Sequence, residues 1–453
     1  MNRSIFKAYD IRGIYPEEIN EEAARKIAQA YLLRLKNKTG KDFKDLKIVV
    51  SQDARLSSKN LAEAVIEEFL TYGVNVDDLG VTSVNDIYVA VGLNGYDGGL
   101  IATASHNPAN YGGFKMAGID NGSIEFLRGA EIEKLLDQVL PPTTETRGVR
   151  RAVDLSEEHL QHILSFIDVK NIRPLKVVVD AGNGTMGLLT PRLFAKTIAN
   201  LIPLFFEPDG NFPNRPPNPL AENAFAKLAD KIKAENADFG IIFDADGDRM
   251  FLVDELGNFV PGDMILLLLA KRMINKNPGT GIVYNLICSK AVPELVTKWG
   301  GKAIRSEVGY LNLARHMQEE GGEMSGEVSA HFAFKHNFYA DSGFIAMALV
   351  LEALSLDSRP LSEIIKEFKL YYRGFEVNFK VESIAAAIAL AEEHYQKNVR
   401  DKIDGLTVEF PDWWFNLRGS NTEPLLRLTV EAENEEVWRL KRDEVLEVIN
   451  GCL

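Results

Sequence analysis

The chain has 453 residues, more than one hydrophobic core usually supports, so its length predicts several domains. Its 65 acidic and 51 basic side chains give a net charge of −14, which repels polyanions and predicts no nucleic-acid partner. Two cysteines, Cys288 and Cys452, do not supply a disulfide framework. The chain opens without a signal-like apolar run. The longest apolar stretch, Met264 to Ala270, suits a buried helix and is too short for a bilayer, so we expect a cytoplasmic protein without a membrane partner.

Short β-branched runs, polar turns and helix-length amphipathic segments alternate along most of the chain, which is typical of an α/β fold with largely parallel strands. From about Tyr371 the rhythm changes to a strand, a helix over 384–398, two apolar runs and a helix over 435–449. We therefore predict three similar α/β domains with mixed, largely parallel sheets and a smaller C-terminal α+β domain around a central cleft. The predicted domains span residues 1–146, 147–256, 257–370 and 371–453.

The hexapeptide Thr103–Pro108 follows an apolar strand and ends in a proline, which predicts an exposed turn that carries Ser105. A serine hydroxyl is a weak nucleophile at neutral pH and needs a nearby base or cation. His106 and Lys115 are the candidates for that role. Taken alone, the hexapeptide is equally compatible with an ordinary turn that has no chemistry.

Three aspartates, Asp244, Asp246 and Asp248, alternate in a loop between two apolar runs. In an extended loop such carboxylates point the same way and converge on one cation, as magnesium or calcium requires. A calcium loop of the EF-hand kind is one alternative, because Glu255 falls at its twelfth position. Arg249 occupies the position where that loop needs glycine, and the flanks are predicted strands. The pattern therefore favours magnesium, with a solvated acidic turn as the other interpretation.

Two further loops suit a sugar and an anion. Glu327, Ser329 and His331 alternate, so an extended backbone would place them on one face, where they suit sugar hydroxyls. The alternative is a polar strand end without a ligand. Near the C-terminus, the segment 418–424 combines Arg418 with a glycine and hydroxyl side chains, which suits a phosphate. A plain turn between two strands is the alternative there.

These four loops, in this order, resemble those of the α-D-phosphohexomutase superfamily, and the likeness extends from residues 7–13 to the phosphate loop. Within the superfamily, the segments 326–331 and 418–422 are most similar to the phosphomannomutase/phosphoglucomutase group, with phosphoglucosamine mutases as the nearest rivals. The resemblance implies an enzyme that interconverts hexose 1-phosphates and 6-phosphates, of mannose or glucose, through a phosphoserine and a hexose 1,6-bisphosphate. It also implies one Mg²⁺ per chain, the bisphosphate as activator and hexose phosphates as partners, and it leaves the oligomeric state open.

The resemblance assigns roles to individual residues. Ser105 carries the phosphoryl group and adds an oxygen to the metal site of Asp244, Asp246 and Asp248. His106, Lys115 and His331 are candidates for proton transfer and charge stabilisation. The implied substrate-binding residues are Tyr9, Arg12, Arg249, Glu327, Ser329, Arg418, Ser420, Asn421, Thr422 and Arg427.

Some positions depart from the superfamily pattern. The segment Ser51-Gln52-Asp53-Ala54-Arg55 stands where Gly-Arg-Asp-x-Arg is common, and Val328 and Ala330 replace residues that are often Met and Gly. These differences leave the preferred sugar open. A phosphatase that uses the same serine, and a non-catalytic protein that binds metal or sugar phosphate, are the competing hypotheses.

Overall fold

The computed structural model describes residues 2–138, 140, 146–374, 376–420 and 425–449, and every statement about structure below refers to these residues. The chain divides into two compact units. The first consists of Met1–Pro261 and His331–Ser362, and the second of Gly262–Ala330 and Glu363–Leu453. Within the described ranges, no helix is both long enough and apolar enough to cross a membrane.

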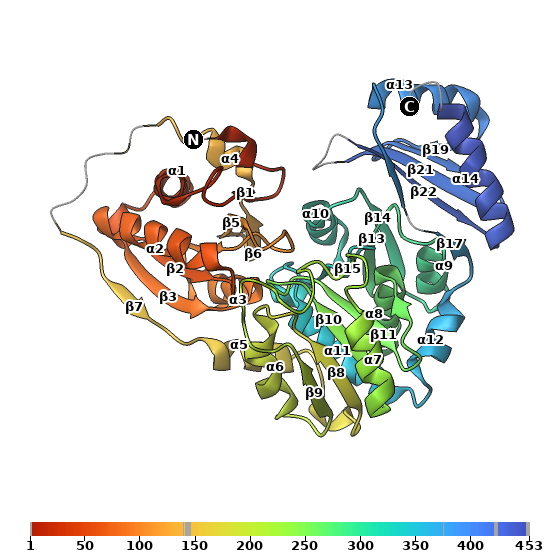
Figure 1. Cartoon of the computed structure of the whole chain (residues 1–453), viewed down its shortest axis with the longest axis horizontal. Coiled ribbons are helices and arrows are strands. Elements are labelled where there is room, and N and C mark those ends of the chain that lie inside the picture. Colours follow the sequence, from red (N-terminus) through yellow and green to blue (C-terminus); the bar gives the residue numbers. More distant parts are fainter. Residues whose placement is uncertain (1, 139, 141–145, 375, 421–424, 450–453) are drawn as a thin grey trace. The chain divides into compact units, whose positions relative to one another are not determined.

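The first unit begins with a mixed seven-stranded sheet in the order β1-β5-β4-β2-β3-β7, with β6 paired to β5 (Figure 1). Its strands are β1 (Ile11–Ile14), β2 (Lys47–Gln52), β3 (Asn75–Val81), β4 (Gly98–Ala102), β5 (Tyr111–Asp120), β6 (Ser123–Phe126) and β7 (Arg150–Ala152). Its helices are α1 (Glu21–Thr39), α2 (Leu56–Thr71), α3 (Val84–Asn94) and α4 (Gly129–Glu133). Strands β4, β2, β3 and β7 are parallel to one another, whereas β5 is antiparallel to each of its neighbours, β1, β4 and β6.

Alternation of side chains along the buried strands gives this sheet two apolar faces. Val50 and Leu100 belong to the core that α1 and α2 cover. Val49 and Ile101 point the other way and pack with α3. With both faces covered, the loop after β4 emerges at the carboxyl edge of the parallel strands, where open α/β sheets bind ligands.

A second mixed sheet in the first unit has the order β12-β11-β10-β8-β9. Its strands are β8 (Lys176–Asp180), β9 (Asn200–Leu204), β10 (Phe239–Phe243), β11 (Met250–Asp254) and β12 (Phe259–Val260). The other elements of this unit are α5 (Ser156–Leu164), α6 (Met186–Phe194), α7 (Ala226–Glu235), β16 (Phe332–Phe334) and α11 (Gly343–Leu356). Strands β10 and β11 are antiparallel, with Phe243 opposite Met250, so the aspartate-rich loop closes a hairpin.

The second unit contains a parallel set of strands and an antiparallel sheet. In the first set, β13 (Gly281–Asn285) pairs with β14 (Lys302–Ser306) and β15 (Gly322–Gly326), accompanied by α8 (Gly262–Lys276), α9 (Ala291–Lys298) and α10 (Tyr310–Glu320). Helix α12 (Leu361–Phe368) leads to the antiparallel sheet, in the order β17-β22-β21-β20-β19 with β18 on β22. Its elements are β17 (Tyr372–Arg373), β18 (Val377–Phe379), β19 (Val399–Asp401), β20 (Leu406–Glu409), β21 (Trp413–Gly419), β22 (Leu426–Ala432), α13 (Ile384–His394) and α14 (Glu435–Ile449). Both of its helices pack against the same apolar face.

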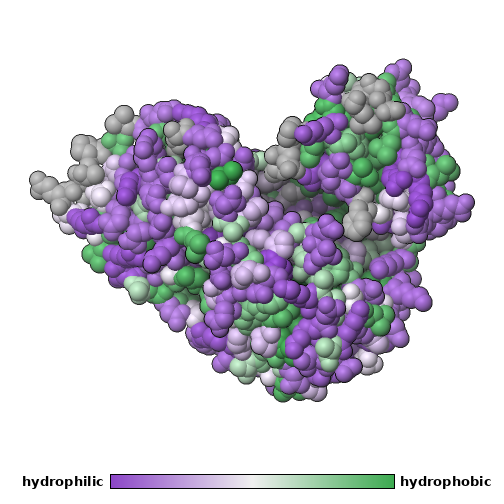
Figure 2. Space-filling model, in the orientation of Figure 1, coloured by the Kyte–Doolittle hydropathy of each residue, from purple (hydrophilic) through white to green (hydrophobic). Residues whose placement is uncertain are grey.

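The predicted fold class is confirmed: three α/β arrangements are followed by a smaller C-terminal sheet with two helices. The stretch Met264 to Ala270 lies in α8 and is buried, as expected. The helix predicted over 384–398 ends at His394 and continues as a 3-10 turn. Short 3-10 helices cover Arg3–Ile5, Phe43–Asp45, Val169–Asn171, Lys335–Asn337 and Gln396–Asn398. Figure 2 shows a mostly hydrophilic visible surface with scattered apolar residues, in keeping with the chain's large share of charged residues.

Candidate active site

Ser105 lies in a turn directly after β4, where the strand pattern placed it. Its backbone φ is 51°, in the left-handed region that residues other than glycine seldom adopt. The prediction of an exposed turn was wrong, because Ser105 is only 2% exposed. Packing against distant segments covers it, and no local pattern reports such packing. Its Oγ lies 3.0 Å from His106 Nδ1.

Two side chains from the turn after β2 hold this conformation. The Ser105 N–H donates to Thr103 Oγ1 at 2.9 Å, and the Thr103 hydroxyl donates to Asp53 at 2.7 Å. The buried Arg55 guanidinium donates to three carbonyl oxygens of the serine turn at 2.5 to 2.6 Å, including that of Ser105. A left-handed residue costs roughly 1–3 kcal/mol, and these contacts offset that cost. Sequence reasoning noted Asp53 and Arg55 only as part of a departing segment and missed their function as supports.

The loop residues 244–248, here called the metal loop, bring Asp244, Asp246 and Asp248 together inside the protein. All three are buried, and one carboxylate oxygen of each lies within 4.8 Å of the others. The backbone is not extended as expected. It bends at Gly247, whose φ is 81°, so the carboxylates converge because the hairpin turns.

The unsatisfied oxygens of this loop test whether a metal fits. Asp246 Oδ1 and Asp248 Oδ1 have no hydrogen-bond partner among the described residues. A buried carboxylate oxygen without a partner is costly, and a hard divalent cation takes such oxygens as ligands. Burial, followed by the charge of Asp248, raises the pKa of Asp244 to about 8. This mutual repulsion is what a bound cation relieves, so the residues fit a divalent metal.

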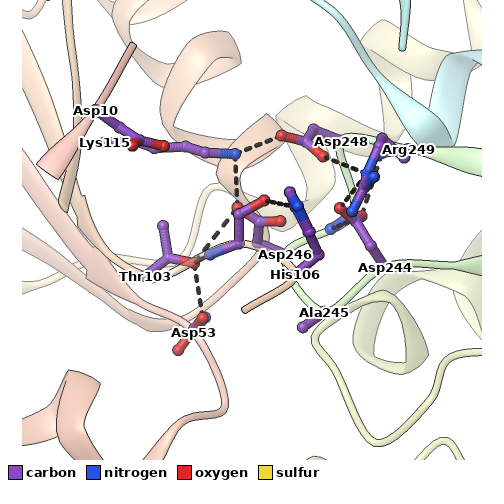
Figure 3. A network of polar contacts seen from close by, with 12 residues as sticks. Asp10, Asp53, Thr103, His106, Lys115, Asp244, Ala245, Asp246, Asp248 and Arg249 are labelled. Atoms are coloured by element: carbon purple, nitrogen blue, oxygen red, sulfur yellow. Dashed lines mark hydrogen bonds and ion pairs between the residues drawn. The ribbon is translucent and has the colours of Figure 1, made fainter. Parts of the chain in front are cut away.

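Lys115 reaches the metal loop from β5, as Figure 3 shows. Its Nζ lies 2.8 Å from Asp246 Oδ2 and also forms an ion pair with Asp248. Burial opposes the charge of this ammonium group. The two aspartates outweigh that effect and raise the pKa of Lys115 well above its ordinary value, so the side chain is a fixed positive charge.

His106 has the opposite environment. Burial, followed by the positive charges of Arg249 and Arg12, holds the pKa of His106 well below its ordinary value. The imidazole is therefore neutral at pH 7, beside the hydroxyl of Ser105. A neutral imidazole at this distance is able to accept the proton of that hydroxyl.

Two other predicted residues of the first unit, Arg249 and Arg12, contact the same cluster. Arg249 donates from Nε to Asp244 at 2.9 Å. Arg12 donates from Nε to Asp10 at 2.7 Å and from Nη1 to the Asn107 side chain of the serine turn at 2.8 Å. Tyr9 is half-buried just before β1.

His331 joins this cluster through the metal loop. Its Nε2 is 3.6 Å from Asp248 Oδ1, and its backbone forms an isolated bridge with Arg249. Asp341, which sequence reasoning missed, forms a second group with Asp248 and His331 whose ligand atoms lie within 4.8 Å of one another. No motif marks Asp341, because it stands ten residues beyond His331.

Comparison with known proteins shows the family to which the chain belongs. Models of the phosphoglucomutase/phosphomannomutase family match four consecutive parts of the chain: α/β/α domain I over residues 3–140, domain II over 157–257, domain III over 261–371 and the C-terminal domain over 376–448. A phosphomannomutase of Escherichia coli is 36% identical over 457 residues, which cover 98% of both chains. The chain belongs to the phosphoglucomutase/phosphomannomutase family. It is therefore an enzyme, a phosphohexomutase of the intramolecular phosphotransferase class.

Further relatives agree. A phosphomannomutase of Methanocaldococcus jannaschii is 35% identical over 452 residues, covering 98% of this chain and 97% of its own. Among solved structures, a phosphoglucomutase/phosphomannomutase family protein of Burkholderia thailandensis is 30% identical, with a TM-score of 0.87. That likeness covers 100% of this chain and 99% of the other.

The predicted sugar residues of this phosphohexomutase lie in the second unit, apart from His331. The segment after β15 is a tight turn and not the extended loop we expected, because the Ala330 N–H donates to the Glu327 carbonyl at 2.9 Å and Ala330 has a φ of 64°. Ser329 lies in this turn. Glu327 is buried, and the Asn285 side-chain amide donates to its carboxylate at 3.0 Å. Asn285 was not found from the sequence.

Of the predicted phosphate residues of the phosphohexomutase, Arg418 lies in β21, Arg427 lies in β22 and Ser420 follows β21. Arg418 and Arg427 stand opposite each other in this strand pair, and both form ion pairs with Glu376. Arg418 Nη1 has no hydrogen-bond partner among the described residues, although the side chain is buried. The Ser420 N–H donates to a backbone carbonyl. Asn421 and Thr422 lie outside the described residues. Paired guanidinium groups suit an anion such as phosphate.

Proposed function

We propose that this phosphohexomutase interconverts the 1-phosphate and 6-phosphate of a hexose, mannose or glucose, through phosphorylated Ser105 and a hexose 1,6-bisphosphate. One observation carries the proposal. The Ser105 hydroxyl, a neutral His106 and a charged Lys115 share one buried cluster with the carboxylates of the metal loop. The relatives named phosphomannomutase support the same reaction class.

The proposed first step moves the phosphoryl group from Ser105 Oγ to a hydroxyl of the bound hexose monophosphate. The bond from phosphorus to the serine oxygen breaks, and the serine oxygen takes a proton from His106, which holds one while Ser105 is phosphorylated. A new bond forms to the sugar oxygen, and the sugar hydroxyl gives up its proton. His331, beside Asp248, is the proposed acceptor of that proton. The product is the 1,6-bisphosphate.

In the second step the bisphosphate presents its other phosphate to Ser105. The Ser105 hydroxyl attacks, its proton passes to His106 Nδ1 at 3.0 Å, and the sugar oxygen leaves with the proton that His331 accepted in the first step. Lys115 stays protonated and balances charge that builds up near the serine oxygen.

Asp244, Asp246 and Asp248 would hold a magnesium ion, together with an oxygen of phosphorylated Ser105. When bound, the ion supplies positive charge to the phosphoryl oxygens. Lys115 balances the negative charge of the transferring group that the ion leaves uncompensated. Arg249 fixes Asp244 through its Nε, and Arg12 steadies the serine turn through Asn107.

We assign sugar binding to Glu327 and Ser329. A carboxylate that bridges the adjacent 3- and 4-hydroxyls serves both orientations of the bisphosphate, because these hydroxyls remain neighbours after the sugar turns round. The residues assigned to the phosphate that does not react are Arg418, Ser420, Asn421, Thr422 and Arg427, with Tyr9 as a supporting residue.

Incubation with ³²P-labelled glucose 1,6-bisphosphate and Mg²⁺ tests the serine. We expect the label on Ser105, identified by peptide mapping, and none on Ser105→Ala. Isomerisation of the 1-phosphates of mannose, glucose and glucosamine, with release of inorganic phosphate followed in parallel, tests the substrate. Preference for the glucosamine ester would assign the rival mutase activity, and phosphate release without isomerisation would indicate a phosphatase. Absence of any label would refute Ser105 as the carrier of the phosphoryl group.

A further inference from the structure

Three consecutive carbonyl groups of the metal loop each accept an N–H from the start of a different helix. The pairs are Thr185 to Ala245 at 3.1 Å, before α6; Val84 to Asp246 at 3.1 Å, in α3; and Gly343 to Gly247 at 3.3 Å, in α11. A helix N-terminus carries a partial positive charge. The three helix starts therefore fix the path of the loop.

One side chain adds to these backbone contacts. Asn85, the second residue of α3, is 0% exposed, and its Nδ2 donates to the Gly247 carbonyl at 3.0 Å. Its Oδ1 has no hydrogen-bond partner among the described residues. Among the described residues, the hydrogen bond to Gly247 is therefore the one polar contact of this amide. Burying an amide with one unused end costs free energy, so packing alone does not explain an asparagine at this position.

We propose that Asn85 is a positioning residue for the metal loop. Together with the three helix starts, it holds Gly247 at its left-handed φ of 81°, and thereby keeps the carboxylates on either side converged before a cation binds. Asn85 itself is not assigned as a ligand. The inference rests on the proposed metal site, and it assigns a residue of α3 to the affinity of that site.

Asn85→Leu tests the contact. Leucine keeps the branching of asparagine but is larger, and the hydrogen bond that it removes is the one to Gly247. Gly343→Ala is an independent probe that removes no polar side chain. A Cβ at this position would lie 2.6 Å from the Gly247 carbonyl oxygen, which must then shift. Alanine also favours the start of α11, so the helix itself is not weakened.

Asn416→Leu is the matched control. Asn416 is 0% exposed, its Nδ2 donates to the Asp404 carbonyl at 2.9 Å, and its Oδ1 also has no partner among the described residues. It lies in β21 of the second unit, whereas the metal loop belongs to the first. Its loss should lower stability without changing metal affinity.

The measurement is the dissociation constant of Mn²⁺ as the probe ion, by isothermal titration and electron paramagnetic resonance, well below each variant's unfolding temperature. We expect about tenfold weaker binding for Asn85→Leu, the effect typical of residues that orient metal ligands, weaker binding for Gly343→Ala and no change for Asn416→Leu. Saturating Mn²⁺ should restore most of the lost activity. Wild-type affinity in Asn85→Leu and Gly343→Ala would overturn the proposal, and Gly343→Ala alone decides if Asn85→Leu does not fold. A wild-type chain that binds no Mn²⁺ would instead refute the proposed metal site.

Discussion

The serine turn and the metal loop meet in one cluster, yet they are fixed by opposite means. The serine turn depends on two side chains. Asp53 accepts from the Thr103 hydroxyl that supports the turn, and Arg55 donates to the carbonyl groups of the turn. The metal loop depends on backbone N–H groups at three helix starts, with Asn85 as an added side-chain donor. A turn held by side chains is open to disruption by single substitutions. A loop held by backbone groups spreads its support over several elements, and single substitutions should weaken it less.

The largest expected effect comes from the serine itself. Ser105→Ala should lower kcat at least about 1000-fold, because no other group takes over a lost nucleophile. Its Mn²⁺ affinity should stay close to that of the unphosphorylated wild type, since the aspartates remain. Kinetic assays and Mn²⁺ titration check both parts. Substantial activity in Ser105→Ala would show that Ser105 is not the nucleophile and that the serine turn is not catalytic.

Arg55→Lys should have the next largest effect. A lysine keeps the charge but cannot reach three carbonyl groups at once, so the serine turn should shift and kcat should fall about 100-fold. Arg173→Lys is the control, because Arg173 also donates to two carbonyl groups, both far along the chain from the serine turn. Equal losses of kcat in the two variants would show that the effect is general destabilisation.

Thr103→Val should be milder. It removes one acceptor for the Ser105 N–H and one donor to Asp53, and a tenfold loss of kcat corresponds to about 1.4 kcal/mol, the scale of one hydrogen bond. Thr103→Ser keeps the hydroxyl and should restore most of the rate. If Thr103→Ser is as slow as Thr103→Val, the lost methyl group and not the hydroxyl is responsible.

The smallest kinetic effect is expected at Asp86, in the first turn of α3. Asp86 accepts from Ser83 and lies 2.7 Å from His159 Nδ1. Burial alone would raise the pKa of Asp86, but His159 and Ser83 together hold it below its ordinary value. A lowered folded-state pKa gives stability that is present above the unfolded value of about 3.9 and is lost as the pH falls through the folded value.

Asp86→Asn should therefore lower the free energy of unfolding by about 2 kcal/mol at pH 7, with little change in kcat. The difference from the wild type should shrink as the pH falls below about 4, which urea unfolding at several pH values checks. A large loss of kcat would show that the metal loop depends mainly on α3 and that the other two helix starts do not compensate.

The chemical residues were the part of the site most open to prediction. Ser105 and the three aspartates follow apolar strands, so the sequence placed them in loops, while the resemblance to the superfamily supplied their roles, which stay predictions. The burial of Ser105 and the bend at Gly247 were not predictable in this way. Both depend on contacts between segments that are distant in the chain, which a local period of alternation does not describe.

The residues that support the site also differ in whether the sequence reveals them. Asp53 and Arg55 left a signal, an aspartate and an arginine two positions apart after a strand, although we interpreted it only as a departure from a common segment. Val84 and Gly343 left none, because they act through N–H groups that every residue except proline carries. Fold class followed from strand and helix periodicity, which is a property of each segment by itself.

The burial of Ser105 also limits what can deliver its first phosphate. A protein kinase needs its target residue to enter a catalytic groove, and this residue is 2% exposed in a turn between two paired strands. Opening that hairpin would mean undoing part of a central sheet. If Ser105 carries the phosphoryl group as proposed, a freshly synthesised chain should stay inert until a small sugar bisphosphate primes it, which would tie the onset of activity to the supply of a metabolite.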